Sequence, residues 1–281
     1  MNILLTGSDG NFGSEFRDKA VGERANVISI GRDGWTTLDE KLASSEVVVH
    51  AASDLRTSAS QEPYRLLNSN VMSTATLLEA SRRHKIKRFV FMSSCAIYGE
   101  DMRTSEESLC CPITINGISK HLNEKLVAEF CAANGIEYQI LRVFNTYGGD
   151  DRFSIFSKLK RALLNQTAFT LNNQGRMLRD FIHVSDVASI VLKLSTRGIR
   201  FTHVNIGTGV ATKIATLVEM VAEQFPQLSI ESGITQEAEY SRADTTKLGE
   251  FWARDFIRVE DYIQHQFVPG ISSELSESGG R

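Results

Sequence analysis

Cysteine is scarce in this chain, and the few that occur are poorly spaced for binding a metal. The four are Cys95, Cys110, Cys111 and Cys131, of which two are adjacent. They lack the paired spacing typical of zinc sites. We therefore predict no metal centre and expect reduced thiols in the cytoplasm, where disulfides are rare.

The sequence also lacks an excess of charge of one sign, a long apolar run and an internal repeat. A net charge of −3 gives no electrostatic attraction to nucleic acid or to an anionic membrane surface. The longest apolar runs are far shorter than the roughly 20 residues that span a bilayer, and the chain begins directly in a core strand, so we expect neither a membrane span nor a signal peptide. The 281 residues, 42% of them apolar, suffice for one large α/β domain with a modest addition.

What the chain does have is a glycine-rich N-terminal stretch, MNILLTGSDGNFG. Asn2–Leu5 is typical of a buried parallel strand, and a helical pattern opens at Glu15. Gly7, Gly10 and Gly13 stand between them at three-residue steps. Glycines allow a tight turn, a close approach of backbone N–H groups to a pyrophosphate, and close packing of helix on strand. The stretch predicts a dinucleotide-binding loop whose helix N-terminus faces the phosphates.

The acidic residue that dinucleotide folds carry after their second strand is missing here. Such an acid accepts hydrogen bonds from the ribose hydroxyls of NAD. In this chain Ala25–Ile30, the predicted second strand, is followed by Gly31 and Arg32. A guanidinium suits a 2′-phosphate, so we expect NADP as the cofactor, with NAD as the second choice. A solvated surface arginine is the alternative for Arg32.

Strand and helix patterns alternate along the rest of the chain and predict a parallel sheet. The further segments expected as strands are Glu46–His50, Arg88–Ser94, Ile136–Val143 and Thr202–Ile206, and those expected as helices are Asn70–Arg83, Ile118–Asn134, Phe153–Leu164 and Thr212–Phe225.

Several motifs occur in the order typical of the extended short-chain dehydrogenase/reductases. They are TGSDGNFG, VVVHAAS, NVMSTATLLEA, FVFMSSCAIYG, the lysine of NGISK, LRVFNTYG, RDFIHVSDVA and VNIGTG. The chain resembles, more narrowly, the NAD-dependent epimerase/dehydratase family, which modifies nucleotide sugars. The resemblance runs from Met1 to about Gly209 and, more weakly, to Trp252.

The resemblance implies an α/β fold with a doubly wound parallel (Rossmann) sheet and a smaller C-terminal substrate-binding domain. The Rossmann part is expected over residues 1–147 and 183–206, and the substrate part over 148–182 and 207–270. Residues 271–281 are rich in Ser, Glu and Gly, and we expect a disordered tail there.

The resemblance also assigns ligand-binding residues and a nucleoside-diphosphate sugar as substrate. Besides the three glycines and Arg32, the positions implied at the cofactor are Asn11, Phe12, Ala51, Ala52, Asn70 and Lys120. Those implied at the substrate are Asn145, Arg179 and Arg242, because arginine forks suit a diphosphate. From spacing alone, a salt bridge from Arg179 to Asp180 or Asp186 is equally open.

The catalytic positions depart from the family pattern at one residue. The family uses a Ser or Thr together with a Tyr whose pKa is lowered by a Lys. Ser94 and Lys120 match, but Asn116 stands where the tyrosine belongs. An amide is not a usable proton donor or base near neutral pH. Cys95 is a candidate substitute, since a thiol moves protons when its pKa falls; a small cysteine packed behind the strand is the alternative.

Two classes of function therefore stay open. One is an NAD(P)-dependent nucleotide-sugar epimerase or ketoreductase with an atypical site, and the other is a non-catalytic dinucleotide- or sugar-nucleotide-binding regulator or assembly subunit. The resemblance further implies a homodimer formed by helices 70–83 and 118–134. The apolar stripe expected on the second helix is Leu122, Leu126, Val127 and Phe130, although such a stripe could equally face the core.

Overall fold

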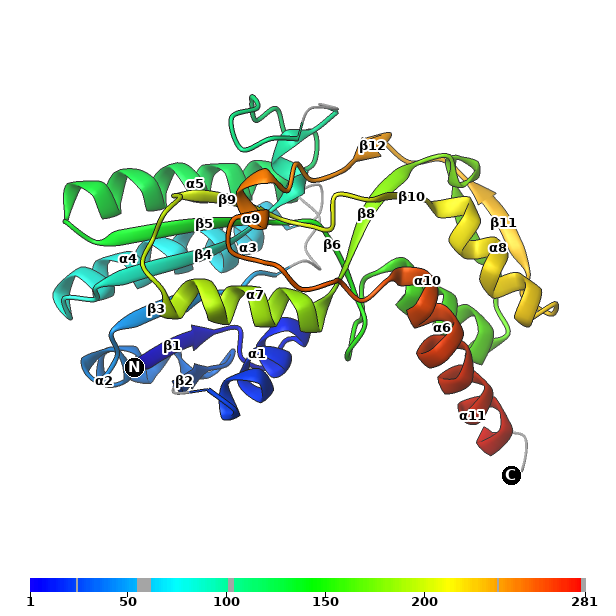
Figure 1. Ribbon diagram of the computed structural model, residues 1–281, viewed down its shortest axis with the longest axis horizontal. Helices are drawn as coiled ribbons and strands as arrows, with labels where there is room; N and C mark the ends of the chain where they lie inside the picture. Colours follow the sequence, from blue (N-terminus) through cyan, green and yellow to red (C-terminus); the bar gives the residue numbers. More distant parts are fainter. Residues whose placement is uncertain (24, 55–61, 101–103, 237, 279–281) are drawn as a thin grey trace.

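A six-stranded parallel sheet forms the larger part of the molecule (Figure 1). The computed structural model describes residues 1–23, 25–54, 62–100, 104–236 and 238–278. The strand order is β2-β1-β3-β4-β5-β9, and every neighbouring pair is parallel. The strands are β1 Asn2–Thr6, β2 Asn26–Ile30, β3 Val47–His50, β4 Arg88–Ser94, β5 Glu137–Val143 and β9 His203–Ile206. The expected doubly wound α/β fold is confirmed.

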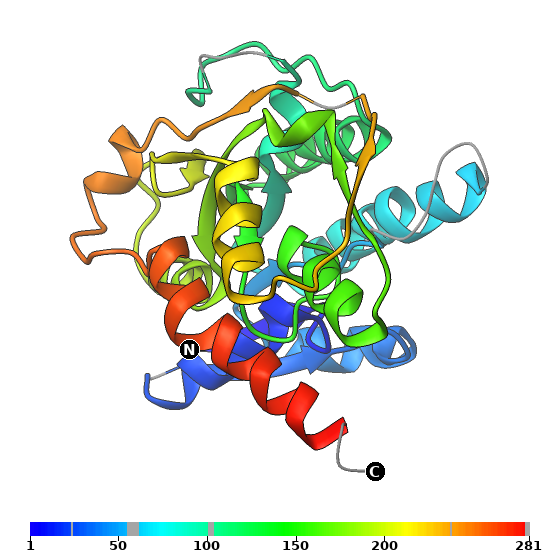
Figure 2. The ribbon, with the colours of Figure 1, turned by 90° about the vertical axis from the view of Figure 1, so that its right-hand side faces the viewer.

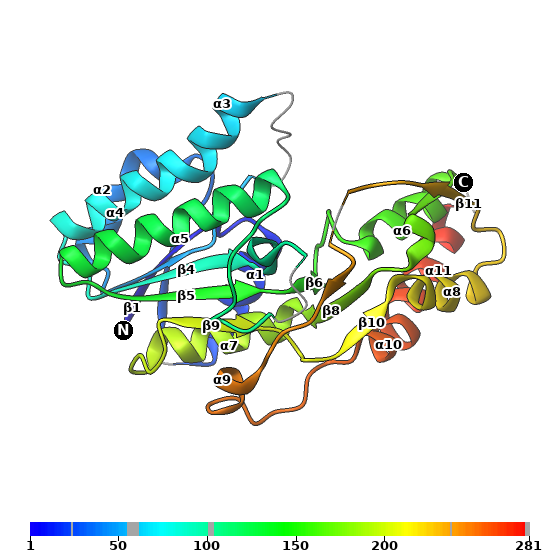
Figure 3. The ribbon, with the colours of Figure 1, turned by 90° about the horizontal axis from the view of Figure 1, so that it is seen from above.

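Helices cover both faces of this sheet (Figure 3). Alternate residues of β1 point to opposite faces: Ile3 and Leu5 pack in the core beneath α1 and α7, and Leu4 packs in the core beneath α2, α4 and α5. Burial on both sides explains why the strands read as continuous apolar runs. The covering helices are α1 Asn11–Val21, α7 Val184–Thr196, α2 Leu38–Ala43 (after the 3₁₀ turn Gly34–Thr37), α4 Ser73–Arg83 and α5 Ile115–Ala133.

The helix expected from Asn70 begins earlier and contains a π-helical segment. The short helix α3, Pro63–Leu66, runs into π-helical Leu67–Met72, which continues as α4. Asn70 is buried inside the π-helical turn. Such wide turns are rare and cluster at functional sites, and a 3.6-residue apolar pattern gives no sign of them.

The smaller part contains two further sheets. The strand β8, Leu178–His183, lies at the centre of the first sheet, in the order β10-β8-β12, and also pairs with β6. The second pairs β11 with β7. The other strands are β6 Asn145–Tyr147, β7 Phe169–Asn172, β10 Ala211–Lys213, β11 Ile230–Gly233 and β12 Tyr240–Ser241. The helices are α6 Ile155–Asn165, α8 Ile214–Gln224, α9 Thr246–Gly249, α10 Val259–Tyr262 and α11 Val268–Ser278 (Figure 2).

The expectation of a disordered tail from residue 271 is wrong as far as Ser278. Helix α11 extends to Ser278, and Ile271 is 1% exposed in the core of the smaller part. Leu275, one turn further on, packs against the same core, and Glu274 forms an ion pair with Lys160 of α6 at 2.5 Å. Residues four apart lie on the same face of a helix, so Ile271 and Leu275 pack together on this core, and the surrounding Ser and Glu residues conceal the pattern in the sequence. Residues 279–281 lie outside the described residues.

Among the residues that the structure describes, no helix is both long enough and apolar enough to cross a membrane.

Candidate functional site

The glycine-rich loop joins β1 to α1 at the carboxyl edge of the parallel sheet, the edge at which ligands bind in folds of this type. Gly7 has φ +72°, and a Cβ there would lie 2.8 Å from the backbone nitrogen of Ala52. A Cβ on Gly13 would lie 2.3 Å from the carbonyl oxygen of Gly7. Gly10 is exposed, and its nearest contact for a Cβ is the Gly7 oxygen at 3.3 Å. The first and third glycines are therefore fixed by packing, and the second leaves room for a ligand.

The start of α1 offers backbone N–H groups to an anion. Asn11 and Phe12 lie in its first turn, where N–H groups have no partner within the helix. The Asn11 amide donates to the carbonyl oxygen of Gly148 at 2.8 Å, and the Phe12 ring packs 5.6 Å from that of Phe16. Their side chains are thus structural, while their N–H groups fit a pyrophosphate. The cradle formed by this turn and the loop suits a dinucleotide.

The segment after β3 lies against this loop and is held in place by Asn70. The Ala52 N–H donates to Thr6 Oγ1 at 3.2 Å, which places Ala51 and Ala52 beside the loop. Asn70 Oδ1 accepts from the Asp54 N–H at 2.7 Å. Asn70 is 3% exposed, so its side chain positions the alanine segment.

The N-terminus of α5 brings the Asn116 turn to the end of β4. A Cβ on Gly117 would lie 2.4 Å from the carbonyl oxygen of Ala96, two residues after Ser94. Ser94 Oγ accepts from the Ala96 N–H at 3.2 Å and so begins the 3₁₀ turn Cys95–Tyr98. One helical turn beyond Asn116, the Lys120 ammonium donates to the carbonyl oxygen of Met92 at 2.7 Å. The three predicted catalytic positions thus share one corner of the sheet.

The electrostatics of this corner centre on Lys120. It is 7% exposed, and burial lowers its pKa to about 8, an effect that Glu124 partly opposes. At neutral pH the ammonium is mostly charged, which would favour ionisation of an acidic group placed beside it. The Asn116 Oδ1 atom is buried and has no hydrogen-bond partner among the described residues.

Replacing Lys120 with methionine is expected to stabilise the fold at pH 7 by about 1–3 kcal/mol, because a buried ammonium is costly. The pKa of Lys120 is about 8 in the folded chain, against a reference value of 10.5. Between these two pH values the unfolded chain therefore binds more protons than the folded chain. Wild-type stability should therefore rise between pH 8 and 10.5, and the variant should lose that rise.

Urea unfolding at pH 7 and pH 10 measures this difference. Lys125→Met, at an exposed position of the same helix, is the control and should leave stability and its pH slope nearly unchanged. A Lys120→Met variant no more stable than wild type at pH 7 would contradict the prediction.

Cys95 is poorly suited to replace the missing tyrosine. Burial raises the pKa of its thiol, and the nearby Ser241 hydroxyl and Arg179 guanidinium offset only part of that rise. A thiol with a raised pKa holds little thiolate at neutral pH. The position of Cys95 nevertheless shows that the end of β4 lies close to Arg179 on β8.

The predicted substrate residues gather around β8. Arg179 is 7% exposed, and its strand neighbours are Thr212 of β10 and Ser241 of β12. The Asn145 amide donates to the carbonyl oxygen of Asp180 at 2.9 Å. Arg242 follows β12 directly and is exposed. The structure thus brings Asn145, Arg179 and the start of the Arg242 loop onto one sheet beside the corner formed by β4 and α5.

Asp180 holds this arrangement together, a role that sequence spacing did not reveal. It is fully buried and accepts hydrogen bonds from the Thr208 N–H at 2.9 Å, the Gly209 N–H at 2.8 Å and the Ala243 N–H at 3.0 Å. Burial raises its pKa, and these donors oppose the rise. Asp186, the other candidate partner of Arg179, accepts from the Ile257 N–H at 2.9 Å.

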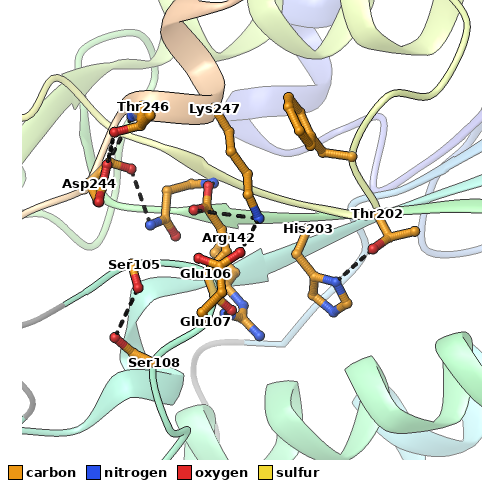
Figure 4. Close-up of polar contacts among 12 residues, drawn as sticks. Ser105, Glu106, Glu107, Ser108, Arg142, Thr202, His203, Asp244, Thr246 and Lys247 are labelled. Atoms are coloured by element: carbon orange, nitrogen blue, oxygen red, sulfur yellow. Dashed lines mark hydrogen bonds and ion pairs between the residues drawn. The ribbon is translucent and has the colours of Figure 1, made fainter.

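A second polar network fastens residues 104–108 to β5, β9 and α9 (Figure 4). Glu106 accepts from the Asn205 N–H at 2.7 Å, and its own carbonyl oxygen accepts from Arg142 at 3.0 Å. Lys247 donates to Glu107 at 2.6 Å. Polar residues within strands of the central sheet, Arg142 in β5 and Asn205 in β9, are the available sequence signal for this network.

Within the described part of the chain, one cluster of metal-ligating residue types occurs despite the unfavourable cysteine spacing. Donor atoms of Cys110, His121 and Glu124 lie within 4.8 Å of one another. Glu124, however, pairs with the Arg142 guanidinium at 2.9 Å and accepts from Ser93 at 2.5 Å. A cation would have to displace a buried guanidinium, so the cluster is better explained as a structural ion pair.

Comparisons with known proteins show the family and the fold. A model of the NAD-dependent epimerase/dehydratase family matches residues 3–207. A Methanocaldococcus jannaschii protein provisionally named UDP-glucose 4-epimerase is 32% identical over 256 residues, which are 79% of this chain and 82% of that protein. The structure of MoeE5 with UDP-glucose and NAD has a TM-score of 0.85 and 27% identity, covering 98% of this chain and 99% of that one. UDP-glucose 4-epimerase from Thermotoga maritima with UDP-glucose has a TM-score of 0.86 and 25% identity, covering 98% and 100%.

Proposed function

Because the chain belongs to the NAD-dependent epimerase/dehydratase family, we propose that it is a nucleotide-sugar epimerase or ketoreductase with an atypical proton relay. The observation that carries the proposal is the shared corner of Ser94, Asn116 and Lys120 beside the strand that bears Arg179. A reaction site and an anion-binding arginine are thus neighbours, as a diphosphate sugar requires.

Two separate groups of residues bind the two ligands, the dinucleotide and the nucleotide sugar. The loop around Gly10 and the first turn of α1 bind the pyrophosphate of a nicotinamide dinucleotide, which when bound accepts and returns a hydride. Arg179, Asn145 and Arg242 orient the nucleotide sugar through its polar groups. The Ser94 hydroxyl hydrogen-bonds the reacting sugar oxygen. Lys120 supplies positive charge beside that oxygen.

Proton transfer is where this site differs from a complete one. The Asn116 amide can hydrogen-bond the sugar or a water molecule but cannot take its proton near neutral pH. Of the predicted catalytic side chains, Lys120 has the pKa closest to neutrality, about 8. We therefore assign proton exchange to Lys120, working through a hydrogen bond that Asn116 helps to hold, and expect slow turnover.

A second function, binding without catalysis, is favoured by the same asparagine. A regulator or assembly subunit would keep the dinucleotide loop and the arginines but would not need the proton carrier. Mass spectrometry of ligands retained on purification, followed by incubation with a panel of nucleoside-diphosphate sugars that includes UDP-glucose, separates the two. Conversion of any sugar supports catalysis, and retention or binding without conversion supports the second function.

We also propose a homodimer formed through α4 and α5, which lie side by side (Figure 3). Ile118 and Leu122 of α5 are each 48% exposed, whereas Val127, expected in the same stripe, is fully buried against the sheet. An exposed apolar pair one turn apart on α5 suits a self-complementary interface.

In sedimentation velocity at micromolar concentration, wild type is expected to be a dimer and Leu122→Glu a monomer, because the charge would be desolvated at the interface. Val21→Glu is the matched control, since Val21 is 87% exposed at the end of α1, on the opposite face of the sheet. A wild-type monomer, or a Leu122→Glu dimer, would rule out this interface.

A further inference from the structure

The carboxylate of Asp9 lies over the end of β2, where the sequence lacks an acidic residue. Asp9 belongs to the glycine-rich loop and immediately precedes Gly10. A Cβ built on Gly31 would lie 1.9 Å from Asp9 Oδ2, 2.8 Å from its carboxyl carbon and 3.0 Å from Oδ1. The space that a side chain at position 31 would fill is therefore occupied by the carboxyl group of residue 9.

This carboxylate is held in place and remains accessible. The Ser8 hydroxyl donates to Asp9 Oδ1 at 3.0 Å, and Ser8 itself is 1% exposed. The loop is fixed to β2 because the Gly7 and Ser8 N–H groups donate to the carbonyl oxygen of Ile30 at 3.0 and 3.4 Å. Asp9 is exposed, so its carboxylate can accept hydrogen bonds from a ligand at the end of β2.

We infer that Asp9 replaces the missing acid and makes NAD, not NADP, the preferred dinucleotide. The inference rests on the proposed function, since it requires that a dinucleotide bind at this loop. In such folds the adenosine ribose lies at the end of the second strand, where a carboxylate accepts hydrogen bonds from its hydroxyls. The same negative charge repels a 2′-phosphate.

Arg32, which suggested NADP, is less well placed to decide the outcome. Arg32 is exposed, and a flexible guanidinium in solvent gains little from a phosphate after screening. The Asp9 carboxylate is held by Ser8 and lies against Gly31, the residue directly after β2. This contact explains the glycine at position 31, because any side chain there would displace the Asp9 carboxylate.

Calorimetric titration of the full chain with NAD⁺ and with NADP⁺ tests the inference. Wild type is expected to bind NAD⁺ more tightly. Asp9→Asn should reduce the ratio of NAD⁺ to NADP⁺ affinity by about tenfold to hundredfold, the size of a charge-assisted hydrogen bond. Asp33→Asn, which removes the same charge from an exposed position two residues after Gly31, should leave the ratio unchanged.

A relocated acid gives a second test. In the Asp9→Ala, Gly31→Asp double variant the atoms that block a side chain at position 31 are gone, so an acid stands at the end of β2 itself. This variant should recover the preference for NAD⁺ that Asp9→Ala loses.

Three results would overturn the inference. They are a wild type that prefers NADP⁺, an unchanged ratio in Asp9→Asn, and a double variant no more selective than Asp9→Ala. If wild type binds neither dinucleotide, both the inference and the proposed function are wrong. Thermal unfolding of each variant verifies that the chain is folded.

Discussion

Replacing Asn116 with tyrosine is expected to raise the rate of hydride exchange with a nucleotide sugar by about 10²-fold or more, the usual contribution of a positioned acid–base group. Residue 116 lies one helical turn before Lys120, so a phenol there would share the helix face of the ammonium. The nearby positive charge would lower the pKa of the phenol and let it exchange a proton. The contact of Gly117 with Ala96 fixes this turn against the end of β4, beside Ser94.

Asn116→Phe is the matched control, because it adds the same ring without the hydroxyl. The change in dinucleotide absorbance, or movement of deuterium on the sugar carbon, measures the rate in each protein. Ser94→Ala should lower the rate in both wild type and Asn116→Tyr, since the sugar oxygen loses a hydrogen bond. Equal rates in the tyrosine and phenylalanine variants would show that the hydroxyl does not carry the proton. A wild type that is already fast, and is slowed by tyrosine, would show that the missing tyrosine does not limit the rate and would make Lys120→Met the next test.

Replacing Gly10 with valine is expected to abolish dinucleotide binding, with a loss of at least about 10²-fold, while the chain stays folded. The structure separates the three glycines of the loop. A Cβ on Gly10 meets only the Gly7 oxygen, at 3.3 Å, whereas Cβ atoms on Gly7 and Gly13 would collide with backbone at 2.8 and 2.3 Å. A valine at position 10 would therefore project into the space for the pyrophosphate, where backbone N–H groups must approach closely.

Calorimetry with NAD⁺ and thermal unfolding, measured on the same preparations, distinguish binding from folding. Gly13→Val is the comparison variant and should lower the unfolding temperature, because its side chain would enter the packed contact between α1 and β1. Gly10→Val that binds NAD⁺ as tightly as wild type would exclude this loop as the phosphate site.

The large parallel sheet could be predicted because each of its strands carries a recognisable pattern within its own few residues. Strands buried on both faces read as apolar runs, and β4 was predicted with its exact bounds, Arg88–Ser94. The smaller part could not be predicted in the same way. Its strands span two to six residues, and their pairing depends on contacts distant in sequence, such as those of Asp180 with Thr208 and Ala243.

The candidate site was likewise predictable only in part. Motif order placed Ser94, Asn116 and Lys120 at one corner, and the structure brings them there. Sequence spacing could not show that the Asp9 carboxylate lies over Gly31, because residues 22 positions apart meet only when β1 and β2 pair. The expected preference for NADP depends on Gly31 and Arg32 alone, whereas the Asp9 contact is the basis for inferring NAD. NAD is the dinucleotide in the MoeE5 structure, which is 27% identical to this chain.

The central claim is that the chain is an enzyme whose missing tyrosine slows hydride transfer without abolishing it. The most direct measurement is the rate of deuterium movement on the sugar carbon of a bound nucleoside-diphosphate sugar, in wild type and Asn116→Tyr, with dinucleotide and sugar binding verified in both. The account predicts slow exchange in wild type and exchange faster by about 10²-fold or more in the variant. Binding of both ligands with no exchange in either protein would contradict it, and the chain would then be a binding protein.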